Sequence, residues 1–417
     1  MRVVMRSVDK VPRVPVEVRP VESRSDLKRF VKLPAALYRN EPGWVPPLII
    51  ERMQFLDKRK NPFFEHAEAE YFIAYRDGEP VGRISAHIDE DLNEFHDNRW
   101  GLFGFFECAE DREAARALFA AAEGWLRERG RDRVIGPMDF TMNDECGILI
   151  EGHDRDALIR QPWTHRYYPE LIEAAGLGKA VDLLMGEIWI EDREKVFPVI
   201  FELAEQIERE HGIKIRKMDK RDLRAETQRF VEVYNAAWAR NWGFTPMREG
   251  AMYHEAKQSK LILDADWMML AETADGEIAA AALTVPDFNQ VLSAVRGRLL
   301  PFGWLRGLRA LRKMTRVRVG FLGVKPEFQH TGIAAALYAE HFETADRKPQ
   351  KGGEMGWILE NNTPMVKAME AIGSTWVKRY RIYEKLLEEG AEPAGPGEGR
   401  PSVDLAGESG GGRPGAE

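Results

Sequence analysis

The chain has 417 residues, enough for two domains of ordinary size, and 44% hydrophobic and 31% charged residues are typical of a folded globular protein. Its net charge of −8 argues against a nucleic-acid partner, because proteins of that class are usually basic. The only cysteines, Cys108 and Cys146, exclude a disulfide scaffold and lack the spacing of zinc ligands, so we predict no metal site and two buried structural thiols.

The terminal segments and the longest apolar stretch indicate the location of the chain and the extent of its ordered part. Residues 1–16 lack the apolar core of a signal peptide, and the longest apolar stretch, residues 278–285, is too short to cross a bilayer. We therefore expect a cytoplasmic protein. Residues 388–417 are rich in Gly, Glu, Pro and Ala and are predicted to be disordered, because they cannot bury apolar area.

The N-terminal half alternates strand and helix patterns. In chain order we predict a strand at 16–22, helices at 25–39 and 47–57, a hairpin around the Asp-Gly-Glu turn at 77–79, a strand at 102–107, a helix at 111–129 capped by Asp111, and a strand at 133–137, before a further helix and a last strand.

The same order returns in the C-terminal half. Strings at 16–19, 77–79 and 172–176 recur at 213–216, 275–277 and 369–373, at offsets of 197, 198 and 197. Three anchors at nearly one offset indicate a duplicated chain. The second copy is predicted to have a strand at 213–218, helices at 222–240 and 249–263, a hairpin at 275–277, a strand at 317–324, a helix at 332–345 and a strand at 354–359. We place the linker near 191–195, so that the domains span 1–190 and 191–387.

A basic segment at 291–318 departs from the repeat. It holds no acidic residue and eight basic ones: Arg296, Arg298, Arg306, Arg309, Arg312, Lys313, Arg316 and Arg318. Apolar residues are interleaved with them, so the segment is predicted either to contact an anionic membrane surface or cover an acyl chain, or to pack on the sheet with a solvated charged face. RNA binding is a weaker third interpretation, because the segment offers only Phe302 and Trp304 for stacking.

The most informative stretch follows this segment. An apolar strand pattern at 319–324 leads through Pro326 to Gln329, Gly332 and Ala334, where a helical pattern begins. A strand, a tight turn and a helix start leave backbone N–H groups free at the helix N-terminus, which favours an anion such as pyrophosphate. Gly332 lets phosphates approach the backbone because it has no Cβ.

This turn resembles the acyl-CoA-binding motif (Q/R)-x-x-G-x-(G/A) of the GNAT acyltransferases, and residues 356–385 resemble the closing segment of a GNAT domain. The resemblance implies an α/β fold with a mixed sheet, two GNAT domains in tandem, and acyl-CoA as a co-substrate with no tightly bound cofactor. It assigns cofactor binding to Leu322, Gly323, Val324, Gln329, His330, Thr331, Gly332, Ile333, Ala334 and Asn362. Asn362 is equally well interpreted as a helix cap.

The first copy lacks this motif. Four acidic residues, Glu107, Glu110, Asp111 and Glu113, lie where a pyrophosphate would bind, and like charges repel it. We therefore predict that the N-terminal half does not bind CoA in the usual place and instead supplies a second wall for the substrate.

Longer strings resemble a bacterial ceramide synthase-like group of tandem GNAT proteins. They lie at 44–48, 61–66, 104–108, 136–147, 167–171 and 241–246. The resemblance covers residues 30–387 and implies acyl-CoA-dependent N-acylation, in some members of a long-chain amine in lipid synthesis. Two features depart from the resemblance. Met369 stands at the position where many GNAT enzymes have a tyrosine that protonates the leaving thiolate. Residues 161–168 are more polar and basic than the group suggests.

Several residues are candidates for proton transfer. Glu360 ends the strand beside the predicted thioester site, although a solvated carboxylate is the competing interpretation. Glu145 lies in a polar loop, and His165 has a near-neutral reference pKa. The acid is predicted to be Tyr383, Tyr380 or water; His66 and His254 are weaker candidates.

We therefore expect an acyl-CoA-dependent N-acyltransferase, with CoA in the C-terminal half and the amine acceptor near the interface between the halves. One alternative is a non-catalytic GNAT pair that binds acyl-CoA or membrane, and another is an aminoacyl-transferring tandem GNAT of the cell-wall type. The basic segment at 291–318 would place the protein at the inner face of the membrane.

Overall fold

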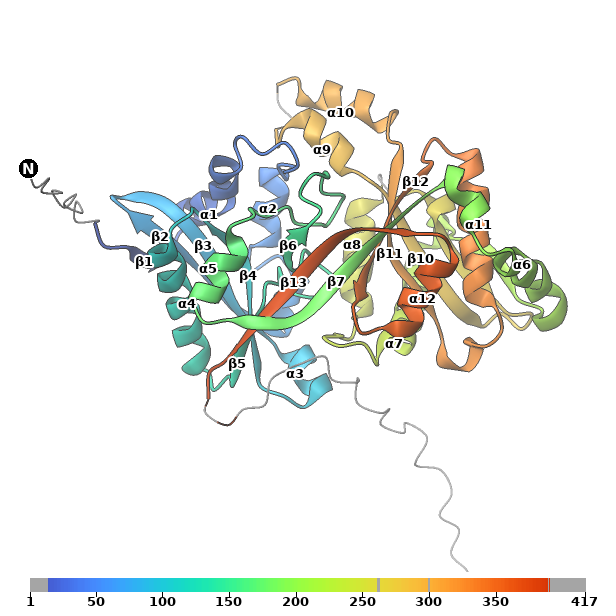
Figure 1. Cartoon of the computed structure of the whole chain (residues 1–417), viewed down its shortest axis with the longest axis horizontal. Helices are drawn as coiled ribbons and strands as arrows, with labels where there is room; N and C mark the ends of the chain where they lie inside the picture. The colour runs from blue at the N-terminus through green and yellow to red at the C-terminus, as the bar shows by residue number, and fades with distance from the viewer. Residues whose placement is uncertain (1–13, 261–262, 299–300, 389, 391–417) are drawn as a thin grey trace, which may run out of the picture.

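A mixed sheet flanked by helices forms the fold in a computed structural model of the chain (Figure 1). The structure describes residues 14–260, 263–298, 301–388 and 390. The tail predicted to be disordered therefore lies outside the described residues, apart from Glu388 and Gly390. The predicted α/β fold class is confirmed, and both cysteines are buried, as expected.

The N-terminal half contains twelve of the described strands and α-helices. In order they are β1 (Glu17–Pro20), α1 (Arg24–Leu37), α2 (Ile49–Phe55), β2 (Ala67–Arg76), β3 (Glu79–Asp89), α3 (Glu90–His96), β4 (Trp100–Cys108), α4 (Arg112–Arg127), β5 (Arg133–Gly136), β6 (Ile148–Glu151), α5 (Tyr168–Ala174) and β7 (Gly178–Trp189), with a short 3-10 helix at Pro62–Glu65.

The C-terminal half repeats this order with additions. After a 3-10 helix at Ile190–Lys195 come α6 (Pro198–His211), β8 (Lys214–Lys217), α7 (Leu223–Trp238), α8 (Glu249–Ser259), β9 (Met268–Glu272), β10 (Ile278–Pro286), α9 (Asn289–Val295), α10 (Gly303–Leu311), β11 (Arg316–Val324), α11 (Ile333–Arg347), β12 (Gly352–Leu359), α12 (Thr363–Ala371) and β13 (Thr375–Leu386). Three further 3-10 helices lie at Lys220–Asp222, Ala265–Trp267 and Pro326–Phe328.

The last strand of each half has changed places with its counterpart. The sheet runs β1-β2-β3-β4-β5-β13-β7-β12-β11-β10-β9-β8, and β6 also pairs with β13. Thus β13 from the C-terminal half pairs with β5, while β7 from the N-terminal half pairs with β12. These two exchanged strands run antiparallel to each other at the centre of the molecule (Figure 1). Each half is therefore completed by a strand of the other.

The exchange also joins the hydrophobic cores. Tyr380, Ile382 and Tyr383 of β13 are fully buried in the same cluster as the apolar faces of β4, β5 and α4. Burying one aliphatic side chain such as Ile382 contributes roughly 1.5–3 kcal/mol. The division at residue 190 stays a prediction about the repeats, since the folded sheets interlock across it.

Local signals explain most elements. Asp111 caps α4 as predicted, and the apolar positions of this helix are buried against the sheet. The predicted hairpin is the β2–β3 turn, where Asp77 and Gly78 have φ of 54° and 78°, conformations that Gly, Asp and Asn tolerate best. The sequence analysis missed α3, β6 and α6. For α6 the signals were present, because it starts at Pro198 and ends before Gly212 in the left-handed conformation.

The basic segment at 291–318 is not one surface helix. It contributes to α9, forms α10 and then enters β11, where Arg318 is buried and Arg316 pairs with the buried Asp287 at 3.0 Å. The prediction of eight cations on one membrane-facing segment is therefore wrong for these two, because they lie within a strand of the sheet. Six remain exposed: Arg296, Arg298, Arg306, Arg309, Arg312 and Lys313.

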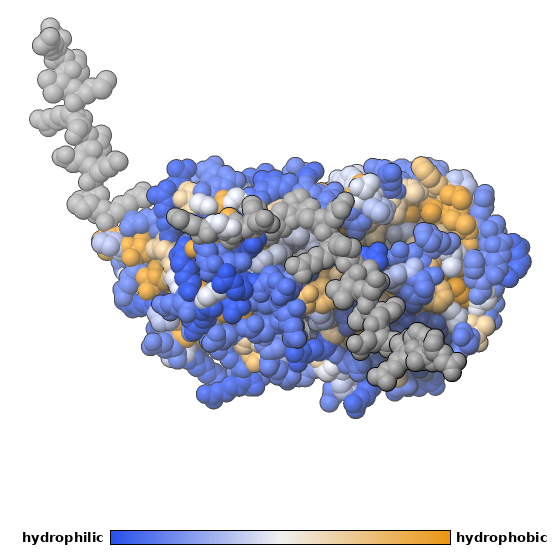
Figure 2. Space-filling view, turned by 90° about the horizontal axis from the view of Figure 1, so that it is seen from below, coloured by the Kyte–Doolittle hydropathy of each residue, from blue (hydrophilic) through white to orange (hydrophobic). Residues whose placement is uncertain are grey.

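The helix α10 projects from one edge of the molecule together with α9 (Figure 1). Large apolar side chains on it or beside it are exposed, with Phe302 at 68% and with Trp304, Leu305, Leu308 and Leu311. The opposite side is mostly hydrophilic with scattered hydrophobic patches (Figure 2). Within the described ranges, every helix falls short of the length and apolar content that crossing a bilayer requires.

Candidate active site

The turn between β11 and α11 carries the motif predicted from the sequence. Gly332 is the N-cap residue, with φ 85° and ψ 5°, a left-handed conformation that glycine adopts without strain. No described side chain caps the helix, and the hydroxyl of Thr331 donates instead to the carbonyl of Phe328 at 2.6 Å. The first backbone N–H groups of α11 are thus left for an anion, which the helix dipole also favours.

Beside this turn, β11 and β12 separate. They pair in parallel only between residues 316–319 and 352–355, whereas the rest of β11 pairs with β10 alone. Leu322, Gly323 and Val324, predicted to hold the pantetheine and thioester, lie on that later part of β11. Its edge toward β12 has no strand partner among the described residues, so main-chain polar groups there are available to a ligand.

The other predicted cofactor residues surround the turn. Gln329 and His330 are exposed, and Ile333 is buried. Asn362 is the N-cap of α12, and its Oδ1 accepts a hydrogen bond from the Met365 N–H at 3.2 Å, which favours the capping interpretation. Leu203 of α6 forms a wall of the turn, since a Cβ on Gly332 would lie 3.5 Å from its Cβ.

The equivalent turn of the N-terminal half is closed by its own side chains. The carboxylate of Asp111 accepts hydrogen bonds from the N–H groups of Glu113 and Ala114 at 3.0 and 3.2 Å. Its other partner is Arg76, at 2.7 Å. A carboxylate thus already takes the place of a phosphate at this helix start, which favours the prediction that CoA does not bind here.

The strand separation of the N-terminal half is partly occupied by side chains of the same half. Phe105 of β4 has φ 49°, and its backbone N–H donates to the carboxyl of Asp139 at 2.7 Å. Glu107 pairs with Arg83 of β3 as Gly323 pairs with Ala281 of β10, at equivalent places in the two hairpins, so Glu107 corresponds to Gly323. The Glu107 carboxylate accepts hydrogen bonds from the hydroxyls of Tyr38 and Tyr168 at 2.5 and 2.7 Å. Side chains of this half therefore occupy part of the space that a pantetheine would need.

A cavity of about 1150 Å³ lies between the two halves. It exceeds the roughly 300–1,000 Å³ of ordinary small-molecule pockets. The N-terminal half contributes α2 and the loops at 139–145 and 157–163, and the C-terminal half contributes α7, α8, α9 and the loop at 241–248. Most lining side chains are apolar, and Gly320, Phe321 and Trp357 bring the cavity to the separation of β11 and β12.

Acidic residues gather on the N-terminal wall of this cavity. Glu145 forms an ion pair with Arg52 at 3.1 Å, and its side chain remains 30% exposed. Burial, and then the charge of Glu145, raise the pKa of Asp139. Burial raises the pKa of Asp144 to about 6. Glu145 thus combines a direct cationic partner with access to the cavity.

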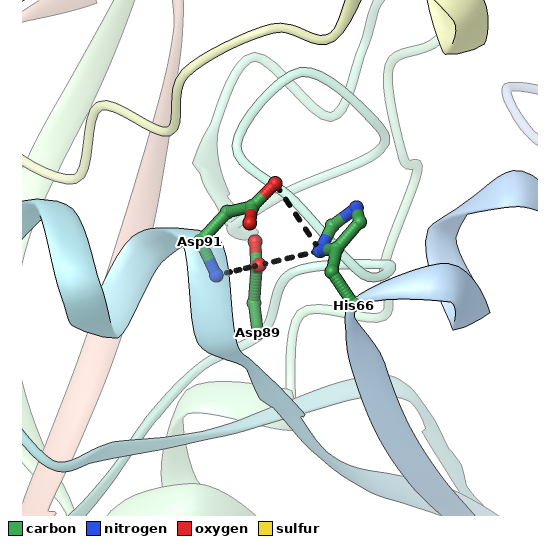
Figure 3. Close-up of side chains that lie close together, drawn as sticks. All are labelled: His66, Asp89 and Asp91. Carbon is green, nitrogen blue, oxygen red and sulfur yellow. Dashed lines mark hydrogen bonds and ion pairs between the residues drawn. The ribbon is translucent and has the colours of Figure 1, made fainter.

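A second polar group involves His66 (Figure 3). Its Nδ1 lies 3.1 Å from Asp89 and 3.5 Å from Asp91, and its Nε2 faces away from both carboxylates. These atoms lie close enough to one another to hold a metal ion. However, Asp89 already accepts hydrogen bonds from helix N–H groups of α3, and Asp91 pairs with Arg248 at 2.6 Å. We interpret the group as an ion-pair network that joins α3 to α8.

The chain has relatives among known proteins. No model of a protein family matches the chain. Over 379 residues it is 35% identical to the bacterial ceramide synthase of Caulobacter vibrioides, covering 89% of this chain and 98% of that protein. The chain belongs to the bacterial ceramide synthase family. It is also 34% identical over 377 residues to protein YghO of Escherichia coli, covering 89% and 95% of the two chains.

Solved structures agree on the fold. A tandem GNAT protein from the clavulanic acid biosynthesis pathway matches with a TM-score of 0.52 at 12% identity, covering 90% of this chain and 100% of that one. A GCN5-related N-acetyltransferase from Sphaerobacter thermophilus matches with a TM-score of 0.51 at 15% identity, covering 92% and 99%. The predicted tandem GNAT fold is confirmed, and this family member is a GNAT-type N-acyltransferase.

Among the four catalytic residues predicted for this ceramide synthase family member, only Glu145 lines the cavity. Glu360 instead pairs with Lys179 at 2.8 Å and accepts a hydrogen bond from the N–H of Asp182 at 3.1 Å. These contacts favour the interpretation of Glu360 as a structural carboxylate that fastens β7.

The other two predicted catalytic residues lie in the packed interior of the N-terminal half. The His165 ring stacks between Tyr38 and Tyr167, with centroids 4.5 and 4.9 Å away, and burial lowers the pKa of His165. Tyr383 is fully buried on β13 opposite Gly136 of β5. The structure therefore brings neither together with the turn at Gly332, because strand exchange takes Tyr383 into the other half.

Sequence reasoning missed Arg52, Asp139 and Arg318 as lining residues of the cavity. A usable signal existed for Asp139, a polar residue that comes shortly after the buried strand β5 within one of the family-like strings. A signal also existed for Arg318, because Val317 and Val319 flank it in a strand pattern. No local pattern indicated that Arg52, in a short helix, would meet Glu145.

Proposed function

We propose that the protein transfers a long-chain acyl group from acyl-CoA to the amine of a long-chain acceptor, and that it does so without a tightly bound cofactor. One observation carries the proposal: a large apolar cavity, walled by both halves, reaches the separated strands beside the uncapped start of α11. The acyl-CoA would bind at Gly332 and along β11, and the acceptor would enter the cavity. The name of the Caulobacter relative supports a lipid product.

The chemistry assigns a role to Glu145. The amine nitrogen attacks the thioester carbon, the C–S bond breaks, CoA leaves as a thiolate, and the attacking nitrogen loses a proton. We assign that proton to Glu145, since it lines the cavity and is accessible. Burial raises the pKa of Tyr380 well above its usual value and that of Tyr383 to about 12. Neither hydroxyl is therefore a good donor, and water protonates the thiolate.

Turnover with a series of donors tests this function. Purified protein is incubated with acetyl-CoA, octanoyl-CoA or palmitoyl-CoA and a long-chain amine, and amide is detected by mass spectrometry while free CoA is titrated with a thiol reagent. We expect palmitoyl-CoA to be the best donor. Absence of amide with every donor contradicts acyl transfer, and a preference for acetyl-CoA contradicts only the long-chain part.

We further propose that α9 and α10 dock on an anionic membrane surface, from which the acceptor enters. The exposed apolar side chains of α10 lie among six exposed cations, and each cation near such a surface contributes roughly 1 kcal/mol. The surface is continuous with the cavity, since Asn289 and Leu292 of α9 line it.

Vesicle sedimentation tests the docking surface. We expect binding to vesicles containing phosphatidylglycerol that weakens with salt and is lost in an R306E/R309E double variant. An R112E/R116E variant on α4 is the matched control, because these arginines are exposed in the other half. Equal binding to neutral vesicles, or equal loss in both variants, contradicts the proposal.

A further inference from the structure

Arg318 is a buried cation whose described partners are all uncharged. It is 5% exposed, and its Nη1 donates to the carbonyls of Ile159 and Arg160 at 3.0 and 3.2 Å. Its Nη2 donates a longer bond of 3.4 Å to the carbonyl of Gly356, and its buried Nε has no hydrogen-bond partner among the described residues. Within the described residues, no carboxylate forms an ion pair with it.

This lack of a counter-charge is unusual within the same sheet. Arg316, two residues earlier, pairs with Asp287 at 3.0 Å, and Arg133 of β5 pairs with Asp132 at 3.3 Å. Burying an ion is costly, and carbonyl dipoles offset only part of that cost. Burial lowers the pKa of Arg318 to about 10, which still leaves the side chain charged at neutral pH. The fold thus keeps an uncompensated positive charge.

The charge lies where β11 and β12 begin to separate. Arg318 pairs with Glu354 in the parallel ladder, whose last rung joins Val319 to Met355. It lines the cavity beside Gly320, and its guanidinium lies 5.1 Å from the ring centroid of Trp357 on the cavity wall. The thioester of a bound acyl-CoA would lie in this same separation, and Arg318 is a cation one rung before the last at which the two strands pair.

We propose that Arg318 stabilises the oxyanion that forms on the thioester carbonyl when the amine attacks. As the N–C bond forms, the carbonyl electron pair moves to oxygen, and when the pair returns the C–S bond breaks. Arg318 donates a charge-assisted hydrogen bond to that oxygen and exchanges no proton. The inference rests on the proposed acyl transfer and adds a catalytic residue to it.

The experiment compares two buried arginines. R318M removes the guanidinium while keeping much of the apolar stem. R133M is the matched control, because Arg133 is also buried, lies over the ring of Trp100 at 5.5 Å and is absent from the cavity lining. Aminolysis of palmitoyl-CoA and its slow hydrolysis without amine are both measured, together with CoA affinity and melting temperature.

We expect R318M to lower aminolysis and hydrolysis alike by about 100- to 1,000-fold, the usual effect of losing an oxyanion donor, with CoA affinity unchanged. R133M should leave both rates near those of the wild type. R318K, which keeps the charge but loses the planar fork, should show a smaller loss of about tenfold and serves as the test if R318M does not fold.

Wild-type rates in either folded Arg318 variant overturn this role. So does a loss confined to aminolysis with a raised KM for the amine, which would assign Arg318 to acceptor binding. A wild-type protein that consumes palmitoyl-CoA by neither route overturns the proposed function itself, whereas a turnover that Arg318 variants leave intact overturns only the oxyanion role.

Discussion

In the C-terminal half, α11 starts at the uncapped Gly332 and β11 separates from β12 with its edge exposed to a ligand. In the N-terminal half, Asp111 caps α4, and Asp139 accepts the hydrogen bond of the Phe105 N–H in the equivalent separation. The backbone plan is the same, but carboxylates bond in one half the N–H groups that lack a side-chain partner in the other, where we propose that CoA binds.

The comparison shows how a duplicated unit can change its role without changing its fold. Once carboxylates accept hydrogen bonds from these N–H groups, the same groups are no longer free to bind a phosphate in the N-terminal half. Its loop at 139–145 instead forms one wall of the shared cavity, where it presents Glu145. The division of labour therefore depends on a few side chains at equivalent positions.

Separating the halves should have the largest effect. A fragment of residues 191–387 lacks β7, the partner of β12, and leaves β13 without β5. We expect neither this fragment nor residues 1–190 to unfold cooperatively in calorimetry, because each has lost a central strand. Co-expression of the two fragments should restore a cooperative transition. A monomeric 191–387 fragment that melts cooperatively and acylates at the wild-type rate contradicts the interlocked sheet.

The turn at Gly332 should account for CoA affinity. We expect G332E to weaken CoA binding at least 100-fold, because its charge repels pyrophosphate and because the left-handed backbone at this position is unfavourable for a residue with a Cβ. G332A isolates the backbone contribution and should lose less. D111A, at the other turn, should cost about 1 kcal/mol of stability through the lost cap and leave CoA affinity unchanged. Calorimetric titration measures all three, and equal affinities in G332E and wild type would refute the site.

The acidic loop offers a smaller effect on chemistry. E145Q should lower kcat/KM by about 100-fold, or ~2.7 kcal/mol, with unchanged CoA affinity, since it removes the proposed base. E360Q should leave kcat/KM within a few-fold, because Glu360 lies outside the lining of the cavity. Steady-state kinetics of the two variants measure kcat/KM. A larger loss of kcat/KM in E360Q than in E145Q would assign the base to Glu360 instead of Glu145.

The buried carboxyl that fills the N-terminal separation should be visible in the pH dependence of stability. Because burial and Glu145 raise the pKa of Asp139 above its ordinary 3.8, the folded protein binds more protons than the unfolded one above that pH. Its contribution therefore falls as pH rises, by ~1.4 kcal/mol for each pH unit up to the raised pKa. We expect the difference in melting temperature, D139N minus wild type, to become larger as the pH rises above 5. A difference independent of pH would show that Asp139 ionises normally.

The parts of the fold that the sequence predicted are those set by local signals. The hairpin at 77–79, the cap at Asp111 and the glycine turn at 329–334 depend on residues close together in the chain. The strand, turn and helix around Gly332 were predicted because the glycine and the two patterns lie within one short stretch.

The parts it could not predict depend on partners far along the chain. Both β7 and β13 have the pattern of an ordinary last strand. Neither sequence indicates that β13 pairs with β5 and β7 with β12, rather than each within its own half. For the same reason Tyr383 was predicted as a candidate acid, although exchange buries it in the other half. Arg318 was included in the basic segment because it ends a run of eight basic residues without an acidic one, whereas in the fold it lies buried on β11.

The number of CoA molecules that one chain binds tests the central claim most directly. Isothermal titration of the full-length protein with CoA should give one equivalent per chain, because of the two equivalent turns only the one at Gly332 has N–H groups free of a side-chain cap. Two equivalents, or one equivalent that persists in G332E, would contradict the assignment of the C-terminal half as the CoA-binding half and the N-terminal half as the wall of the acceptor cavity.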